Sequence, residues 1–163
     1  MTCSYRSPKS EFKNDFDACA KLAGPNAPLS LLIIDVDRYQ YVNMECGHVV
    51  GDAVLVEVAS TIKAACRGKG RCSRWAGGAL AVLLPNVDMN EAVALAEQLR
   101  QKISQLRVEN CTEPVTVSIG VASCPGTNDT FDHLVRDAEE AMYAAKAEGR
   151  NRVSIAAGQQ TLR

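Results

Sequence analysis

The sequence predicts a single α/β (α+β) domain in which helices cover a sheet, and three observations lead to this prediction. A nearly continuous apolar run at residues 29–36 is typical of a strand that is buried on both faces. Apolar stripes at helical spacing are interleaved with strand-like runs along the chain rather than segregated from them. The 163 residues contain no internal repeat or low-complexity segment, and this length suits one domain with one core.

The first third of the chain is expected to place three helices around one strand. Apolar residues recur at helical spacing over residues 8–21, which predicts the first helix. The buried strand at 29–36 follows, and a short helix is expected at 38–45. An amphipathic stripe at residues 52–66 predicts a longer helix that packs on the sheet.

The middle of the chain predicts a β-hairpin. Short apolar or mixed runs at residues 71–75 and 80–84 flank the turn Ala76-Gly77-Gly78-Ala79. This turn contains only small residues, so the tip of the hairpin carries no charge.

The last part of the chain predicts a helix, a strand, a second helix and a second strand. One apolar helical face extends over residues 90–106, and β-branched residues alternate over 115–123, as in an interior strand. Another helical stripe begins at Phe131 and ends at Gly149. A final short strand is expected at residues 152–155.

Composition and charge argue against several kinds of binding partner for this chain. The net charge is −1 and no basic run occurs, which argues against a nucleic-acid or membrane surface. The seven cysteines form no C-x-x-C pair and have no histidine at metal spacing, so free thiols are expected rather than a zinc site. Because no apolar signal or membrane-spanning segment is present, we expect a cytoplasmic protein.

Two acidic residues lie at the end of the buried strand. Asp35 and Asp37 provide two nearby carboxylates, and Mg²⁺ binds proteins through one or two carboxylates together with substrate phosphates. Asp-x-Asp is equally common at a solvated strand end or as a helix cap. The pair alone therefore leaves a metal site and a structural role open.

The wider context of this pair resembles a known family. Residues 35–52 match the pattern D-x-D-x-F-K-x-x-N-D-x-x-G-H-x-x-G-D of the GGDEF family in spacing throughout. The other family signatures follow in the expected order at residues 74–75, 81–85, 116–122 and 145–153. The resemblance covers about residues 8–156, which we take as the core of a single domain over 1–163.

The resemblance implies a fold and a chemistry. It implies the ferredoxin-like palm of nucleotidyl cyclases, with a mostly antiparallel sheet and a β-hairpin that carries the family motif. Two such domains face each other and join two GTP molecules into cyclic di-GMP. By position, Asp35 and the carbonyl of Val36 resemble magnesium contacts. The implied nucleotide-binding residues are Asn43 and Asp52 for a guanine edge, and Lys146 and Arg150 for phosphates.

These implied roles agree with the chemistry of the side chains. An amide and a carboxylate together offer the donors and acceptors that a guanine edge requires, and Lys and Arg neutralise phosphate charge. For Lys146 and Arg150 a structural role is also open, because cations at a helix C-terminus favour the helix dipole.

The chain departs from the family at the hairpin. The family places G-G-D/E-E-F there, whereas this chain has A-G-G-A-L, with Gly78 and Ala79 at the two acidic positions. The first acid would hold magnesium with Asp35 and the second would act near the 3′-hydroxyl, so we expect negligible cyclase activity and weak or absent Mg²⁺ binding. Gln40 also replaces the lysine of the D-x-D-x-F-K pattern.

The inhibitory product site of the family is also incomplete. Its R-x-x-D pattern keeps Arg67 but has Gly70 in place of the aspartate. We therefore expect a degenerate GGDEF domain that binds GTP or docks on a partner, either another cyclic di-GMP signalling protein or a second copy. The alternatives are a weakly active diguanylate cyclase and a scaffold that no longer binds nucleotide.

Overall fold

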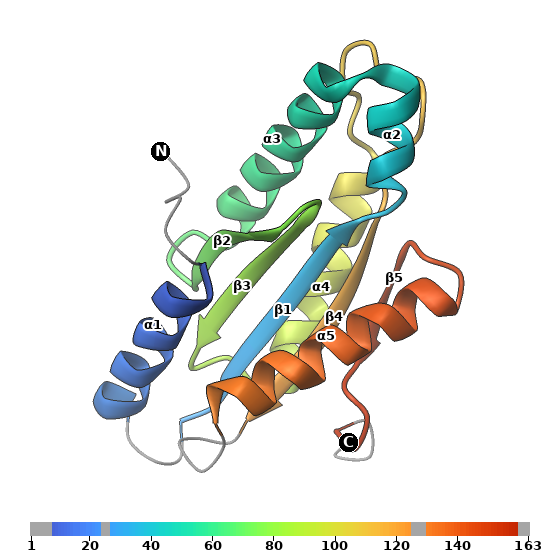
Figure 1. The fold of residues 1–163 in the computed structure, drawn as a ribbon. Coiled ribbons are helices and arrows are strands. Elements are labelled where there is room, and N and C mark those ends of the chain that lie inside the picture. Colours follow the sequence, from blue (N-terminus) through green and yellow to red (C-terminus); the bar gives the residue numbers. More distant parts are fainter. Residues whose placement is uncertain (1–7, 24–26, 125–129, 160–163) are drawn as a thin grey trace.

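The computed structural model describes residues 8–23, 27–124 and 130–159, which form one sheet with helices on both faces (Figure 1). The elements in chain order are α1 (Pro8–Ala23), β1 (Leu29–Val36), α2 (Tyr39–Cys46), α3 (His48–Ala65), β2 (Arg71–Ala76), β3 (Ala79–Pro85), α4 (Met89–Ser104), β4 (Val117–Cys124), α5 (Phe131–Ala147) and β5 (Arg152–Ile155).

The sheet has the strand order β2-β3-β1-β4-β5. Strand β1 pairs antiparallel with β3 and with β4, β2 pairs antiparallel with β3, and only β4 and β5 are parallel. The sheet is therefore mixed and mostly antiparallel, as the resemblance implied. Strand β1 is central, so its C-terminal end with Asp35 lies between β3 and β4.

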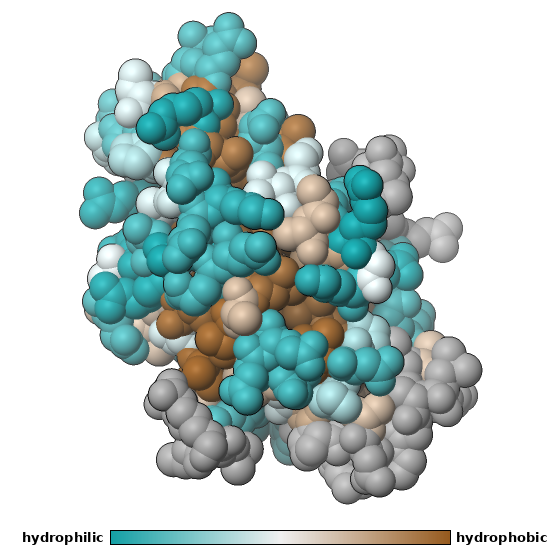
Figure 2. Space-filling model, turned by 180° about the vertical axis from the view of Figure 1, so that it is seen from behind, coloured by the Kyte–Doolittle hydropathy of each residue, from teal (hydrophilic) through white to brown (hydrophobic). Residues whose placement is uncertain are grey.

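The apolar run of β1 is buried on both faces, as its sequence predicts. Leu32 and Ile34 belong to a core with residues of α3 and α4, whereas Leu31 and Ile33 belong to a second core with residues of α1 and α5. Because successive strand residues point to opposite faces, one apolar segment serves both layers. Seen from behind, the surface is mainly hydrophilic, with hydrophobic side chains visible between the polar ones (Figure 2).

The predicted boundaries of β1 and β5 are confirmed, and α3 differs. It begins at His48, four positions before the expected start at residue 52. Gly47 has φ 87°, a conformation that ends α2 and allows α3 to begin at the next residue. Val50 is then part of the buried stripe of α3.

Cys46, Cys66 and Cys111 are free thiols in the described part of the chain. Burial raises the pKa of the Cys66 thiol to about 11, and nearby Lys69 offsets only part of this rise. Since the thiolate is the reactive form, Cys66 is an inert core residue at neutral pH. Across the described ranges, no helix combines the length and apolar character needed to cross a membrane.

Candidate functional site at the end of the central strand

The hairpin tip lies directly beside the end of β1. The Val36 N–H donates a hydrogen bond of 3.0 Å to the Gly78 carbonyl, and Asp35 is the register partner of Ala79. Side chains of directly opposed strand residues lie on the same face of a sheet. The two positions where the family carries acids are therefore adjacent to the residues predicted as metal contacts, and here they carry a hydrogen atom and a methyl group.

Two glycines form the turn of this hairpin, as predicted. Ala76 pairs with Ala79 across the turn, and Gly77 has φ 50°, which favours glycine. Arg74 closes the tip by donating from Nε and Nη2 to the Gly77 carbonyl at 3.2 and 2.8 Å. The turn is thus held by backbone and guanidinium contacts rather than by an acidic group.

The first residue of α2 fills the space on one side of this turn. A Cβ atom at Gly78 would lie 2.9 Å from Cβ, Cγ and Cδ2 of Tyr39, closer than real Cβ contacts. Tyr39 is itself partly buried against the core beneath α2 and α3. A side chain at position 78 would therefore have to displace the Tyr39 ring from its packed position.

A double-mutant cycle tests this contact. We expect Gly78→Ala to lower the free energy of unfolding by about 1–3 kcal/mol, the usual effect of overpacking. In a Tyr39→Ala background most of that loss should disappear, because the methyl group then enters open space. Urea unfolding of the four proteins measures the coupling. An equal loss in both backgrounds would show that Tyr39 does not crowd position 78.

Lys146 reaches the same strand end from the other side. It lies in the last turn of α5, and its Nζ forms an ion pair with Oδ2 of Asp35. The two side chains are 26% and 18% exposed, so the pair is largely buried but still open to solvent. The structure thus brings together two of the predicted site residues from opposite ends of the chain.

Asp37 has a different environment from Asp35. It is buried, and its two oxygens accept hydrogen bonds from Ser118 Oγ at 2.6 Å, Thr116 Oγ1 at 2.7 Å and the Asn151 N–H at 3.0 Å. A buried carboxylate is stable when donors of this kind surround it. Asp37 therefore links the end of β1 to β4 and to the loop before β5. Both of its carboxylate oxygens already accept hydrogen bonds.

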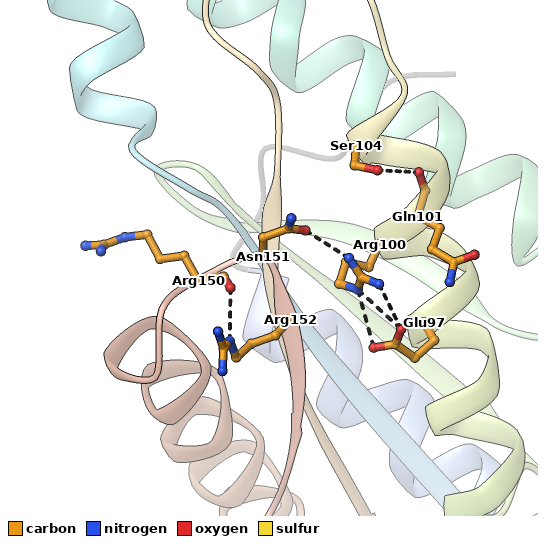
Figure 3. Close-up of polar contacts among 7 residues, drawn as sticks. All are labelled: Glu97, Arg100, Gln101, Ser104, Arg150, Asn151 and Arg152. Atoms are coloured by element: carbon orange, nitrogen blue, oxygen red, sulfur yellow. Dashed lines mark hydrogen bonds and ion pairs between the residues drawn. The ribbon is translucent and has the colours of Figure 1, made fainter.

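The loop that carries Arg150 is also held by contacts between Asn151 and Arg100 of α4 (Figure 3). Arg100 donates from Nη1 to Asn151 Oδ1 at 3.1 Å and pairs with Glu97 on the same helix at 3.1 Å. Arg150 and Asn151 both have positive φ, at 64° and 46°, so the backbone turns sharply here. The exposed Arg150 side chain extends away from the Arg100 cluster in Figure 3.

A pocket of about 180 Å³ opens beside this loop. Arg38 and Tyr41 of the α2 segment line it together with Arg150, and Asp37 contributes to its lining as well. Glu113 lines the same pocket, so two carboxylates accompany the two guanidinium groups and the formal charges of the lining cancel.

Asn43 lies against α3 with its amide partly buried. Its Oδ1 is buried without a hydrogen-bond partner in the described part of the chain. A Cβ on Gly51 would lie only 1.7 Å from this oxygen, so glycine at 51 makes room for the amide. Asp52, the next residue, is exposed on the first turns of α3. An orphan buried acceptor destabilises the fold by about 1–3 kcal/mol.

Residues 9–152 match the family model described as "Diguanylate cyclase, GGDEF domain". This chain belongs to the GGDEF family. It is 39% identical to the diguanylate cyclase DgcM of Escherichia coli K12 over 127 residues, which are 78% of this chain and 30% of that protein. It is 36% identical to the response regulator PleD of Caulobacter vibrioides, over 77% of this chain and 29% of that protein. The chain thus spans about a third of the length of these relatives.

Solved structures confirm the predicted fold of the GGDEF domain. The active GGEEF domain of a diguanylate cyclase from Vibrio cholerae matches with a TM-score of 0.84 and 29% identity, over 96% of this chain and 98% of that one. The cyclase SiaD of Pseudomonas aeruginosa, solved with its activator SiaC, matches with a TM-score of 0.83 and 28% identity, over 94% of this chain and 62% of that one.

The residues at the strand end of this GGDEF domain do not fit a magnesium site. Asp35 is paired with Lys146, both Asp37 oxygens accept protein hydrogen bonds, and positions 78 and 79 offer no side-chain oxygen. No group of three or more His, Cys, Asp or Glu residues that could hold a metal ion occurs in the ranges described. Magnesium is usually held by one or two carboxylates together with substrate phosphates, and here Asp35 is already paired with an ammonium group.

The remnant of the inhibitory site is exposed in the turn after α3. Arg67 lies there, following the end of that helix at Ala65. At Gly70, a Cβ would lie 2.3 Å from the backbone carbonyl of Leu83 on β3. The aspartate that the family carries at this position would require the backbone to move, so the R-x-x-D pattern is not one substitution away from completion.

Sequence reasoning missed three contributors to this site. It did not assign the crowding role of Tyr39, the space that Gly51 leaves for Asn43, or the clamping of Asp37. The hydrogen bonds to Asp37 could have been predicted. Thr116 and Ser118 alternate with apolar residues at the start of β4, so their side chains point to the same face of the sheet.

Proposed function

We propose that this GGDEF domain is a regulatory domain of cyclic di-GMP signalling that binds GTP and lacks diguanylate cyclase activity. The observation that carries the proposal is the hairpin tip beside Asp35 and Val36, where Gly78 and Ala79 provide no carboxylate. Loss of general acid-base assistance lowers rates by about 10²–10⁴-fold, and loss of a metal site adds to this.

The retained nucleotide contacts support GTP binding. Asn43 is half-buried beside α3, and Asp52 is exposed on that helix. A guanine edge presents N–H donors that complement an amide oxygen and a carboxylate. Lys146 and Arg150 supply positive charge toward a phosphate chain.

A second candidate function is a protein-interaction domain without nucleotide, either with a signalling partner or with a second copy of the chain. The observation that favours it is the exposure of Met44, Val49 and Val56 at 83%, 84% and 63%. Val49 and Val56 lie seven positions apart on α3 and so share one face of that helix. Exposed apolar side chains on one helix face can contribute to an interface.

Two measurements test the proposed function. Calorimetric titration with GTP should give micromolar affinity, whereas the absence of heat at millimolar GTP would favour the interaction domain. Chromatography of GTP incubated with the protein should show no cyclic di-GMP above background, over a range of protein concentrations because two domains must meet. Cyclic di-GMP above background would overturn the claim that the domain lacks cyclase activity and would support the weakly active cyclase.

The guanine contacts provide a sharper prediction. Asn43→Ala and Asp52→Ala are each expected to weaken GTP binding at least about tenfold, since a lost hydrogen bond to a buried or charged group amounts to about 1.5–3 kcal/mol. Glu57→Ala is a matched control, because Glu57 is also an exposed acid on α3. Equal affinities for all three variants and the unmodified protein would rule out this guanine site.

A further inference from the structure

We infer that Lys146 is the resident cation of the strand end and that GTP binding by this domain is therefore independent of divalent metal. The inference rests on the proposed GTP binding. It adds which positive charge lies beside the phosphates of the bound nucleotide. The juxtaposition that carries it is the ion pair between Lys146 Nζ and Asp35 Oδ2, with no carboxylate at Gly78 or Ala79 beside it.

The charge of Asp35 is balanced by Lys146 without a metal. Asp35 contributes one negative charge and Lys146 one positive charge, and the oxygens of Asp37 are occupied by Thr116, Ser118 and the Asn151 N–H. A divalent cation that approached Asp35 would have to displace an ammonium group from a largely buried pair. Like charges at such distances repel strongly where water is partly excluded.

The ammonium group can bridge Asp35 and a phosphate. It has three N–H donors, and the ion pair engages the carboxylate from one side. About a quarter of the Lys146 side chain is exposed, so an anion in solvent can reach the remaining donors. Arg150 lies four residues after Lys146, on the loop that follows α5, and is a second cation close to Lys146 in the chain. If Lys146 contacts Asp35 and a phosphate at the same time, it bridges the two anionic groups as a metal ion would.

The test uses the variant Asp35→Asn, for which a metal site and a lysine site predict opposite changes in GTP affinity. GTP affinity is measured by calorimetry in excess magnesium and in excess EDTA. For the unmodified chain we expect affinities that agree within about threefold. Asp35→Asn should tighten GTP binding by about threefold to tenfold in both buffers, because it removes a negative charge near the phosphates and releases the ammonium. Lys146→Met should weaken binding, most strongly in EDTA.

The opposite pattern would overturn the inference. If magnesium holds the nucleotide, EDTA should weaken binding of the unmodified chain more than tenfold and Asp35→Asn should weaken it as well. Asp35→Asn is isosteric, and circular dichroism confirms that each variant is folded.

A measurement without nucleotide separates this inference from the proposed function. Water-proton relaxation during titration with Mn²⁺ should reveal no saturable site on the unmodified protein. A saturable Mn²⁺ site that Asp35→Asn removes would show that a metal, and not Lys146, is the resident cation. Failure of every form to bind GTP would refute the proposed function, and the Mn²⁺ titration would still decide which cation Asp35 holds.

Discussion

Returning both acids to the hairpin, as Gly78→Asp with Ala79→Glu, is expected to raise cyclic di-GMP synthesis at least about 10²-fold above the unmodified chain. The reason is positional. Position 78 lies beside Val36 and position 79 beside Asp35, so both new carboxylates would enter the strand end. Three carboxylates would then lie near one ammonium group, so a magnesium ion could compete with Lys146 for Asp35, and the restored variant should require magnesium.

The structure also sets limits on this variant. The aspartate side chain introduced at position 78 must displace the Tyr39 ring, so a lower stability is expected alongside the gain in activity. Leu80 is left unchanged because it is 1% exposed and already fills its core position, where a larger ring would overpack. Product is quantified by chromatography at a temperature at which circular dichroism shows the folded state.

The matched control is Gly78→Asn with Ala79→Gln, which has nearly the same shape without the charges. It should stay at background. If the acidic variant is folded and equally silent, the missing acids are not sufficient to explain the loss of activity, and the neutral Gln40 or the pair between Asp35 and Lys146 becomes the cause.

Local patterns predicted most of the fold. The run at 29–36 is apolar at every position but the two polar ones at 30 and 35, and this indicated burial on both faces before any partner was known. The mostly antiparallel pairing came instead from the family resemblance, and the strand order came from the structure, because apolar alternation does not say which strand pairs with which. The start of α3 was missed, since Gly47 separates two helices without any loop and periodicity alone blurs such a junction.

The candidate site, like the fold, was predicted from the sequence only in part. Asp35 and Asp37 have the same side chain two positions apart, and only the structure separates them into an ion pair with Lys146 and a clamp for Thr116 and Ser118. The partners lie far along the chain, so no local pattern specifies them. The family motif supplied the residues, and the structure supplied their contacts.

Gly120→Ala is expected to have the largest effect on stability, a loss of about 3 kcal/mol or more in the free energy of unfolding. A Cβ at Gly120 would lie 2.1 Å from the Ala138 carbonyl oxygen and 2.3 Å from the Met142 nitrogen. Both atoms belong to the backbone of α5, which no side-chain rotation can move aside. The helix would have to lift from β4, and urea unfolding measures the loss.

Gly68→Ala is the control, since nothing lies within 4 Å of its Cβ position and φ is +76°. Its loss of about 1 kcal/mol arises from the backbone alone. If the two substitutions were equally destabilising, close packing of α5 on β4 would not be the cause. Lifting α5 also withdraws Lys146 from Asp35, because both the glycine contact and the lysine belong to the same rigid helix. Any Gly120→Ala protein that remains folded should therefore bind GTP less tightly, although position 120 is far from every predicted nucleotide contact in sequence.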